Sequence, residues 1–203
     1  MKKAGLGLAA ALTLMLTGCA SAPPSNPENL CDIFREKKGW HEDALAMEKR
    51  WKVPVHVPMA MMYQESMFRH DARPPKKYVL GFIPWGRVSS AYGYSQALDG
   101  TWAEYKKSTG HTFAERDDYG DAMDFMGWYI RRTNKINKVS VTDAKAGYLN
   151  YHEGWGGYRK KTYLRKSWLV GVANKVGKRS NTYRAQYQSC KGSLSNSFWR
   201  RIF

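Results

Sequence analysis

The sequence predicts a single domain built mainly from α-helices. Alternation of apolar and polar residues, which is typical of a half-buried strand, is scarce, whereas apolar residues recur at spacings of three and four along most of the chain. Glycine-containing loops separate the segments with this spacing, and the chain shows no internal repeat. The expected domain, residues 30–203, has a length that suffices for one substantial apolar core.

Helical spacing predicts six helices, and the second is the expected centre of the domain. It begins near Pro58, which suits a first turn because proline has no N–H to leave unpaired, and it runs to Phe68 through a sequence rich in methionine. Asp99 and Asp143 are placed to cap two later helices. The helices are expected at residues 42–51, 58–68, 99–105, 121–132, 143–151 and 163–176.

Residues 73–90 differ from the rest of the domain because prolines, glycines and aromatic residues are concentrated there. The pattern fits either a short hairpin or a loop. The segment could form a lid or an edge on which a ligand stacks, or it could only close a loop. Its prolines and aromatic residues are Pro74, Pro75, Tyr78, Phe82 and Trp85.

The first residues of the chain have the layout of a signal peptide, expected at residues 1–18. Lys2 and Lys3 precede an apolar run of residues 4–16, which at about 13 residues is shorter than the roughly 20 that a membrane-spanning helix needs. A transmembrane anchor is the less favoured alternative.

The run ends in Leu16-Thr17-Gly18-Cys19, which resembles the lipobox of bacterial lipoproteins. The resemblance implies that Cys19 is lipidated, so that the protein is anchored to a membrane and does not span it. Ala20 after the cysteine resembles the sorting pattern for the outer membrane of a Gram-negative bacterium, facing the periplasm. Residues 19–29, rich in Pro, Ser and Asn, are expected to form an extended tether.

Two further cysteines, Cys31 and Cys190, lie near the two ends of the expected domain. In an oxidising compartment they could form a disulfide, or they could remain two independent buried thiols. A disulfide that closes so long a loop would stabilise the fold by roughly 4 kcal/mol.

The chain is strongly basic, with 33 Lys and Arg against 17 Asp and Glu and a formal net charge of +16. Such a charge predicts an anionic neighbour or simply a well-solvated surface. Export disfavours nucleic acid and leaves cell-wall peptide carboxylates and lipid phosphates.

Glu65 is the first candidate catalytic residue because it lies in the methionine-rich segment of the expected central helix. A carboxyl group with apolar neighbours resists ionisation and can donate a proton near neutral pH. Taken alone, the pattern is more typical of an exposed or paired glutamate on a helix.

Three segments extend this pattern: Tyr63-Gln64-Glu65-Ser66-Met67-Phe68, then Ala91-Tyr92-Gly93-Tyr94-Ser95-Gln96-Ala97, then Asn150-Tyr151-His152-Glu153-Gly154-Trp155-Gly156. In this order they resemble the lytic transglycosylases with a goose-lysozyme-like SLT domain, and the resemblance covers approximately residues 53–158. It implies a lysozyme-like α fold and activity on peptidoglycan.

The resemblance also implies roles for individual residues. Glu65 would be the catalytic acid, and Tyr151 would hold its carboxyl group through the phenol, unless Tyr151 is only a core aromatic. Ser66 would orient the same carboxyl or a substrate group, or it would bond to local backbone. The residues implied to bind substrate are Ser66, Gly93, Tyr94, Ser95, Gln96, Tyr151 and His152; Tyr94 and Ser95 replace the family's Leu and Met, and His152 replaces its Asn.

The reaction implied by the resemblance needs one carboxyl group. Glu65 would protonate the oxygen of the β-1,4 bond between N-acetylmuramic acid and N-acetylglucosamine, and would then accept the proton of the muramyl C6 hydroxyl, which gives a 1,6-anhydro product. A lysozyme-type hydrolase is the alternative and needs a second carboxylate. The candidates are Asp71, Asp99, Glu104, Asp117, Asp118 and Glu153.

A third alternative is a cell-wall-binding lipoprotein without activity. The expected partners are peptidoglycan glycan strands and, through the lipid on Cys19, a membrane; nucleic acid is not expected, and the protein is expected to be a monomer. No cofactor and no metal are expected, because the five histidines lack the spacing of zinc ligands.

Overall fold

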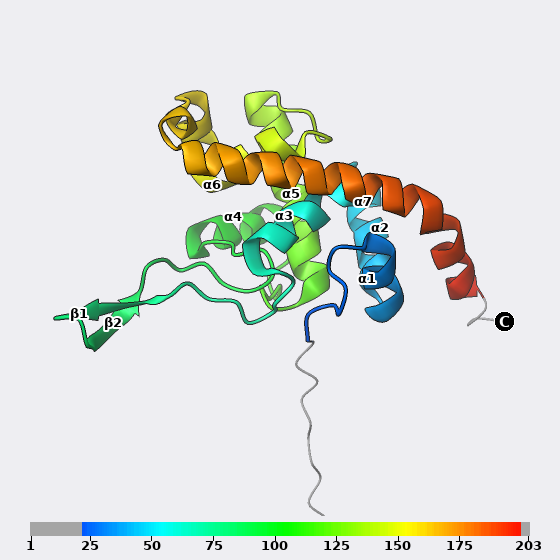
Figure 1. Ribbon diagram of the computed structural model, residues 1–203, viewed down its shortest axis with the longest axis horizontal. Helices are drawn as coiled ribbons and strands as arrows, with labels where there is room; N and C mark the ends of the chain where they lie inside the picture. The colour runs from blue at the N-terminus through cyan, green and yellow to red at the C-terminus, as the bar shows by residue number, and fades with distance from the viewer. Residues whose placement is uncertain (1–21, 200–203) are drawn as a thin grey trace, which may run out of the picture.

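Helix α3 (His56–Ser66) lies at the centre of the computed structural model, which describes residues 22–199 (Figure 1). Its residues from His56 to Met62 are all buried. Because the part from Val57 to Met62 is apolar on every side, it is stable only in the interior of a domain. The predicted signal peptide and Cys19 lie outside the described residues.

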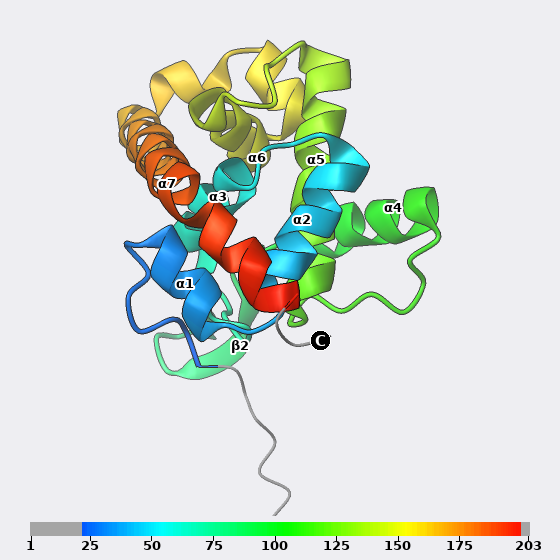
Figure 2. The ribbon, with the colours of Figure 1, turned by 90° about the vertical axis from the view of Figure 1, so that its right-hand side faces the viewer.

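The other helices surround α3, and α7 crosses over α3 and α6 before it reaches α1 (Figures 1 and 2). One apolar core joins them. The helices are α1 (Leu30–Glu36), α2 (Trp40–Trp51), α4 (Asp99–Thr109), α5 (Tyr119–Asn137), α6 (Ala144–Arg159), the 3-10 turn η1 (Thr162–Arg165) and α7 (Ser167–Trp199). Among residues 22–199, none of these helices combines the length and the apolar character required to cross a bilayer.

Helices α2 and α5 pack closely because α5 carries a glycine at their crossing. A Cβ atom at Gly127 would lie 2.6 Å from side-chain atoms of both Met47 and Trp51. Arg131, one helical turn further along α5, donates hydrogen bonds to the backbone oxygens of Trp51 and Lys52 at 2.6 and 3.0 Å. It therefore satisfies carbonyl groups that the end of α2 leaves unpaired.

The mainly α-helical class is confirmed, with differences at the helix ends. Asp143 caps α6 as predicted and accepts a hydrogen bond from the amide of Ala146 at 2.9 Å. The prediction of Asp99 as a cap is wrong: Leu98 occupies the cap position of α4, and the Asp99 carboxylate instead pairs with Arg116 at 2.8 Å. The helix predicted at residues 163–176 is divided into η1 and a longer α7.

Residues 73–90 contain a two-stranded antiparallel hairpin, which settles the choice between a hairpin and a loop. Its strands are β1 (Lys76–Val79) and β2 (Ile83–Arg87). Leu80 and Gly81 at its tip both have positive φ, of 54° and 80°. The hairpin extends away from the helices (Figure 1), so in this structure it does not close over the body of the domain.

The described part of the expected tether, residues 22–29, is bound to the domain. Ser25 donates hydrogen bonds from its amide and hydroxyl to Glu36 at 2.8 and 2.6 Å. Glu28 accepts a hydrogen bond from Tyr63 at 2.7 Å and forms an ion pair with Arg179. The prediction of an extended tether is therefore wrong for these residues, because each polar side chain finds a partner on the helices.

Cys31 and Cys190 form a disulfide that joins α1 to α7, with Cα atoms 6.1 Å apart. The pairing confirms the predicted alternative of a bridge over two free thiols. It closes a loop with a sequence separation of 159, for which loss of unfolded-state entropy stabilises the fold by roughly 4 kcal/mol.

Candidate active site

Two hydrogen bonds bring the three predicted motif segments together. The hydroxyl of Ser66, at the end of α3, donates to the backbone oxygen of Tyr94 at 2.7 Å. The phenol of Tyr151, on α6, donates to the backbone oxygen of Ser95 at 2.6 Å. The loop of residues 91–97 is thus held between α3 and α6.

Glu65 lies in the last turn of α3, where the helix leaves the apolar core, and its side chain is partly buried. Burial raises the pKa of its carboxyl group to about 7, and a hydrogen bond from the Tyr148 phenol acts in the opposite direction. Desolvation disfavours the charged form of a carboxyl group, whereas a donor to the carboxylate favours it. Glu65 can therefore exist in both protonation states near neutral pH.

The sequence did not reveal Tyr148 as the partner of Glu65. Tyr148 is buried on α6, and its phenol bonds to the Glu65 carboxyl. Tyr151 does not donate to this carboxyl group, because its single phenolic hydrogen is donated to Ser95. The charge of Glu65 nevertheless helps to raise the pKa of Tyr151, so a supporting role of Tyr151 toward Glu65 stays a prediction. Tyr148 precedes Tyr151 by three residues and so lies on the same face of the helix, which is the signal that could have identified it.

Ser66 is a structural residue. Its side chain is buried, and its hydroxyl bonds to the backbone of Tyr94 and lies 3.3 Å from the backbone oxygen of Met62. The prediction that Ser66 orients the carboxyl group or a sugar is wrong, and the alternative of a backbone bond is correct. Ser66 positions the loop next to Glu65.

Glycine is required at position 93. Gly93 has a φ of +75°, and a Cβ atom there would lie 2.0 Å from the backbone oxygen of Arg116. Its amide donates to the oxygen of Ala72 at 3.0 Å, and its own oxygen accepts from the Gln96 side chain at 2.9 Å. Both backbone groups of Gly93 are therefore engaged within the loop, and its contact with sugar stays a prediction.

The side chains that follow Gly93 also serve the loop itself. Tyr94 and Ser95 are 2% and 0% exposed, so their side chains are not open to a substrate, and the expected contact of this segment with sugar through backbone groups stays a prediction. Gln96 donates from Nε2 to the backbone oxygens of Ala72 and Gly93 at 2.8 and 2.9 Å. Because both hydrogens of its amide are used, Gln96 has only its oxygen to offer to a ligand.

A hollow of about 260 Å³, which we call the Gln96 hollow, lies beside this loop. It brings together three of the predicted binding residues, Gln96, Tyr151 and His152, with Glu153 and Tyr129. The Tyr129 ring contacts the Tyr151 ring at a centroid distance of 4.8 Å, nearly edge to face. The hollow therefore combines aromatic side chains with a few polar groups, which is a common composition of ligand-binding pockets.

His152, which stands where the resembled family has Asn, is exposed and bonds to its neighbour on α6. Its Nδ1 lies 3.0 Å from Oε1 of Glu153, and the Lys166 ammonium lies 2.7 Å from the same oxygen. Burial acts to raise the pKa of Glu153, but hydrogen bonds from Lys166, Thr162 and His152 outweigh it and lower that pKa to about 2. Glu153 is therefore a fixed anion in the Gln96 hollow.

The six acids considered as a second catalytic carboxylate all have other partners. Four of them form ion pairs: Asp71 with Arg69, Asp99 with Arg116, Glu104 with Arg132, and Glu153 with Lys166. Asp117 accepts a hydrogen bond from Tyr92, and Asp118 caps α5. None of these six acids is among the causes that set the pKa of Glu65, which are burial and the hydrogen bond from Tyr148.

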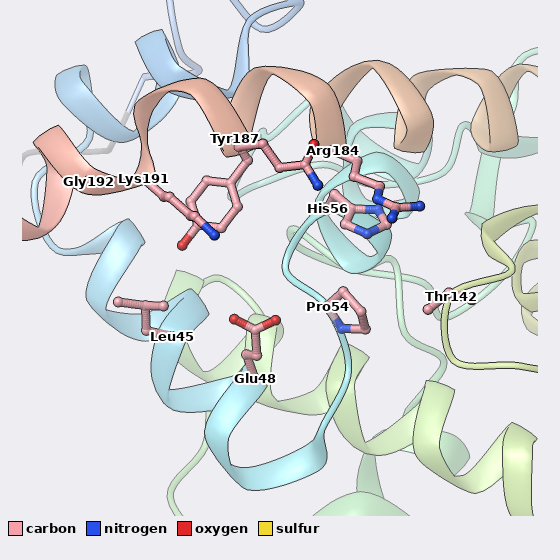
Figure 3. Close-up of a pocket in the computed structure, with 10 residues that line it drawn as sticks. Leu45, Glu48, Pro54, His56, Thr142, Arg184, Tyr187, Lys191 and Gly192 are labelled. Atoms are coloured by element: carbon pink, nitrogen blue, oxygen red, sulfur yellow. The ribbon is translucent and has the colours of Figure 1, made fainter.

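A larger hollow of about 830 Å³ lies at the opposite end of α3, between α2 and α7 (Figure 3). Its carboxylate, Glu48, accepts a hydrogen bond from the backbone of Val55, and burial raises its pKa. His56 lies nine residues before Glu65, about 13 Å along the helix. This hollow is therefore separate from the candidate active site. Within residues 22–199, no group of three His, Cys, Asp or Glu side chains has the arrangement of a metal site.

Comparison with known protein families identifies the chain. The family model of the transglycosylase SLT domain matches residues 7–190, which is more than half of the sequence. The chain belongs to this SLT family. Membership implies a transglycosylase-type enzyme that binds peptidoglycan, and it agrees with the helical fold and its small hairpin. No curated protein and no solved structure matches the chain.

Replacement of Tyr148 in the SLT domain tests how the Glu65 carboxyl group is tuned. Tyr148→Phe removes a donor to the carboxylate, so the pKa of Glu65 should rise by about 1 from its value of about 7. The measurement is an NMR pH titration of the glutamate carboxyl carbons, with the Glu65 signal assigned from Glu65→Gln. Tyr151→Phe is the matched control; a larger shift in this control than in Tyr148→Phe would contradict the assignment.

The pH dependence of the stability of the SLT domain should also show that folding raises the pKa of the Glu65 carboxyl group. The pKa of Glu65 is raised on folding, so its contribution is fully present below pH 4.5 and is lost as the pH rises through about 7. We therefore expect the free energy of unfolding of Glu65→Gln, relative to the wild type, to increase by about 2 kcal/mol between pH 5 and pH 8. Urea unfolding at both pH values measures it, with the exposed Glu115→Gln as the control. Equal differences at the two pH values would show that folding does not raise the pKa of Glu65.

Proposed function

We propose that this SLT domain is a lytic transglycosylase in which Glu65 is the single catalytic acid and base. The observation that carries the proposal is the Glu65 carboxyl group, with a pKa of about 7 that is set by burial and a tyrosine. A residue that first donates and then accepts a proton works best when its pKa lies near the working pH.

In the proposed reaction, neutral Glu65 donates its proton to the oxygen that links N-acetylmuramic acid to N-acetylglucosamine. The bond from that oxygen to the muramyl C1 breaks, and the acetamido group of the same sugar supports the positive charge at C1. The Glu65 carboxylate then accepts the proton of the C6 hydroxyl as its oxygen bonds to C1. The products are a 1,6-anhydromuramyl end and a free N-acetylglucosamine end, and Glu65 is again neutral.

The surroundings of Glu65 favour this reaction over hydrolysis by two carboxylates. In hydrolysis a second carboxylate would act as nucleophile or would activate water. The acids predicted for that role each pair with an arginine, a lysine, a tyrosine or a helix end. Of these acids, Glu153 is the nearest to Tyr151 in sequence, but its carboxylate bonds to Lys166, Thr162 and His152.

The Gln96 hollow is the proposed site for part of the glycan strand. The Gln96 oxygen can accept a hydrogen bond from an amide or hydroxyl of a sugar, and His152 and Glu153 lie on the same rim. The basic surface, from a formal net charge of +16, suits the carboxylates of the peptide stems.

We further propose that the enzyme works as a lipoprotein of the outer membrane that faces the periplasm, with its lipid on Cys19, and as a monomer. The sequence Leu16-Thr17-Gly18-Cys19-Ala20 supports the anchor. The disulfide between Cys31 and Cys190 supports an oxidising compartment.

Glu65→Gln should lower the rate of release of soluble fragments from purified peptidoglycan by at least about 100-fold, because the amide cannot transfer the proton. Glu153→Gln, a change of the same kind in the neighbouring hollow, should retain measurable cleavage. Circular dichroism establishes that both variants are folded. Normal activity of a folded Glu65→Gln protein would refute the proposal, and an inactive wild type would favour a binding protein without catalysis.

A further inference from the structure

The hairpin β1–β2 is an unusual part of the domain because none of its residues is buried. All residues of both strands are exposed, and the hairpin extends away from the helices (Figure 1). A two-stranded hairpin with neither face covered is only marginally stable in water. Its exposed faces therefore suit contact with something outside this domain.

The tip of the hairpin is apolar throughout. Residues 79–85 contain no charged and no polar side chain. Leu80, Phe82 and Trp85 are 78%, 72% and 72% exposed, and the branched side chains of Val79 and Ile83 are also exposed. Contiguous exposed apolar residues of this kind mark contacts with other proteins or with membranes.

Basic residues lie directly behind the apolar tip. Lys76 and Arg87 are partners across the two strands, and Lys77 follows Lys76. Like charges directly opposite each other destabilise a strand pair. Among residues 22–199, Lys76 and Lys77 take part in no ion pair, so a nearby anion would relieve this repulsion.

The distance along the hairpin between the apolar tip and the basic residues matches the depth of a membrane interface. The pair Val79 and Ile83 lies beyond the pair Lys76 and Arg87 by three residues on β1 and four on β2, which is about 10 Å along β1. Peripheral segments bury their apolar face roughly 5–10 Å into the boundary between headgroups and acyl chains. Trp85 lies between the two levels, where amphipathic rings favour the interface.

We propose that the hairpin tip inserts into a bilayer surface that contains anionic phospholipids, with Lys76, Lys77 and Arg87 at the phosphate groups. Phe82 and Trp85 are flat rings that could also stack on a sugar, but Leu80, Val79 and Ile83 add exposed branched aliphatic side chains, which gain more from burial among acyl chains than from contact with a glycan. The inference goes beyond the proposed cleavage reaction and does not depend on Glu65.

Sedimentation with vesicles tests this proposal. The chain from residue 22 onward contains the whole described core and the disulfide, and it omits the apolar run of residues 4–16, which would bind vesicles by itself. We expect it to bind vesicles of phosphatidylglycerol and phosphatidylethanolamine, and to bind phosphatidylcholine vesicles more weakly.

Two variants and two matched controls locate the contact. Leu80→Ser with Phe82→Ser should lower vesicle binding at least about tenfold, whereas Phe113→Ser, at a 94% exposed phenylalanine in another part of the chain, should bind like the wild type. Lys76→Gln with Lys77→Gln should lower binding to anionic vesicles roughly fivefold for each charge removed. Lys106→Gln with Lys107→Gln, at the end of α4, is the matched control for charge.

Quenching by brominated lipids gives an independent measurement on the wild-type fold. The quenching of tryptophan fluorescence should be largely lost in Trp85→Phe. The proposal is overturned if the wild type does not bind anionic vesicles, or if the tip variant binds as tightly as the wild type. It is also overturned if the tip changes abolish binding to purified peptidoglycan and leave vesicle binding unchanged, because the hairpin would then be a glycan-binding edge.

Discussion

The structure depends on the packing of the surrounding helices around α3, which also buries the Glu65 carboxyl group near the end of this helix. From Val57 to Met62, the side chains of helix α3 are apolar on all sides and buried, so the surrounding helices pack against it completely. The same packing that stabilises the fold removes water from the Glu65 carboxyl group and raises its pKa to about 7. Stability and reactivity therefore come from a single arrangement.

Three other motif residues, Ser66, Tyr151 and Gln96, fix the loop of residues 91–97 in the candidate active site. Ser66 and Tyr151 each bond to the backbone of the loop that contains Tyr94 and Ser95, one from α3 and the other from α6. Gln96 holds the same loop from within. Residues that look like ligands of a sugar in the sequence are thus mostly supports that fix where Glu65 and the Gln96 hollow lie.

The sequence predicted the helical class, the central helix, the disulfide as one of two alternatives, and the segments that form the site. These features follow from local spacing, from residue chemistry or from motif order. It did not predict the partner of Glu65, because the choice between Tyr148 and Tyr151 depends on how α6 is rotated against α3, which only packing decides. It also missed the contacts of residues 22–29, since the partners of Ser25 and Glu28 lie on helices distant in sequence.

The central claim is that Glu65 cleaves the glycan without water, and digestion of peptidoglycan in ¹⁸O-labelled water tests it most directly. Mass spectrometry of the released muropeptides should find 1,6-anhydromuramyl ends, each lighter by one water than a hydrolysis product and free of ¹⁸O. Reducing muramyl ends that carry one ¹⁸O atom would contradict the account, because water would then have taken the place of the C6 hydroxyl.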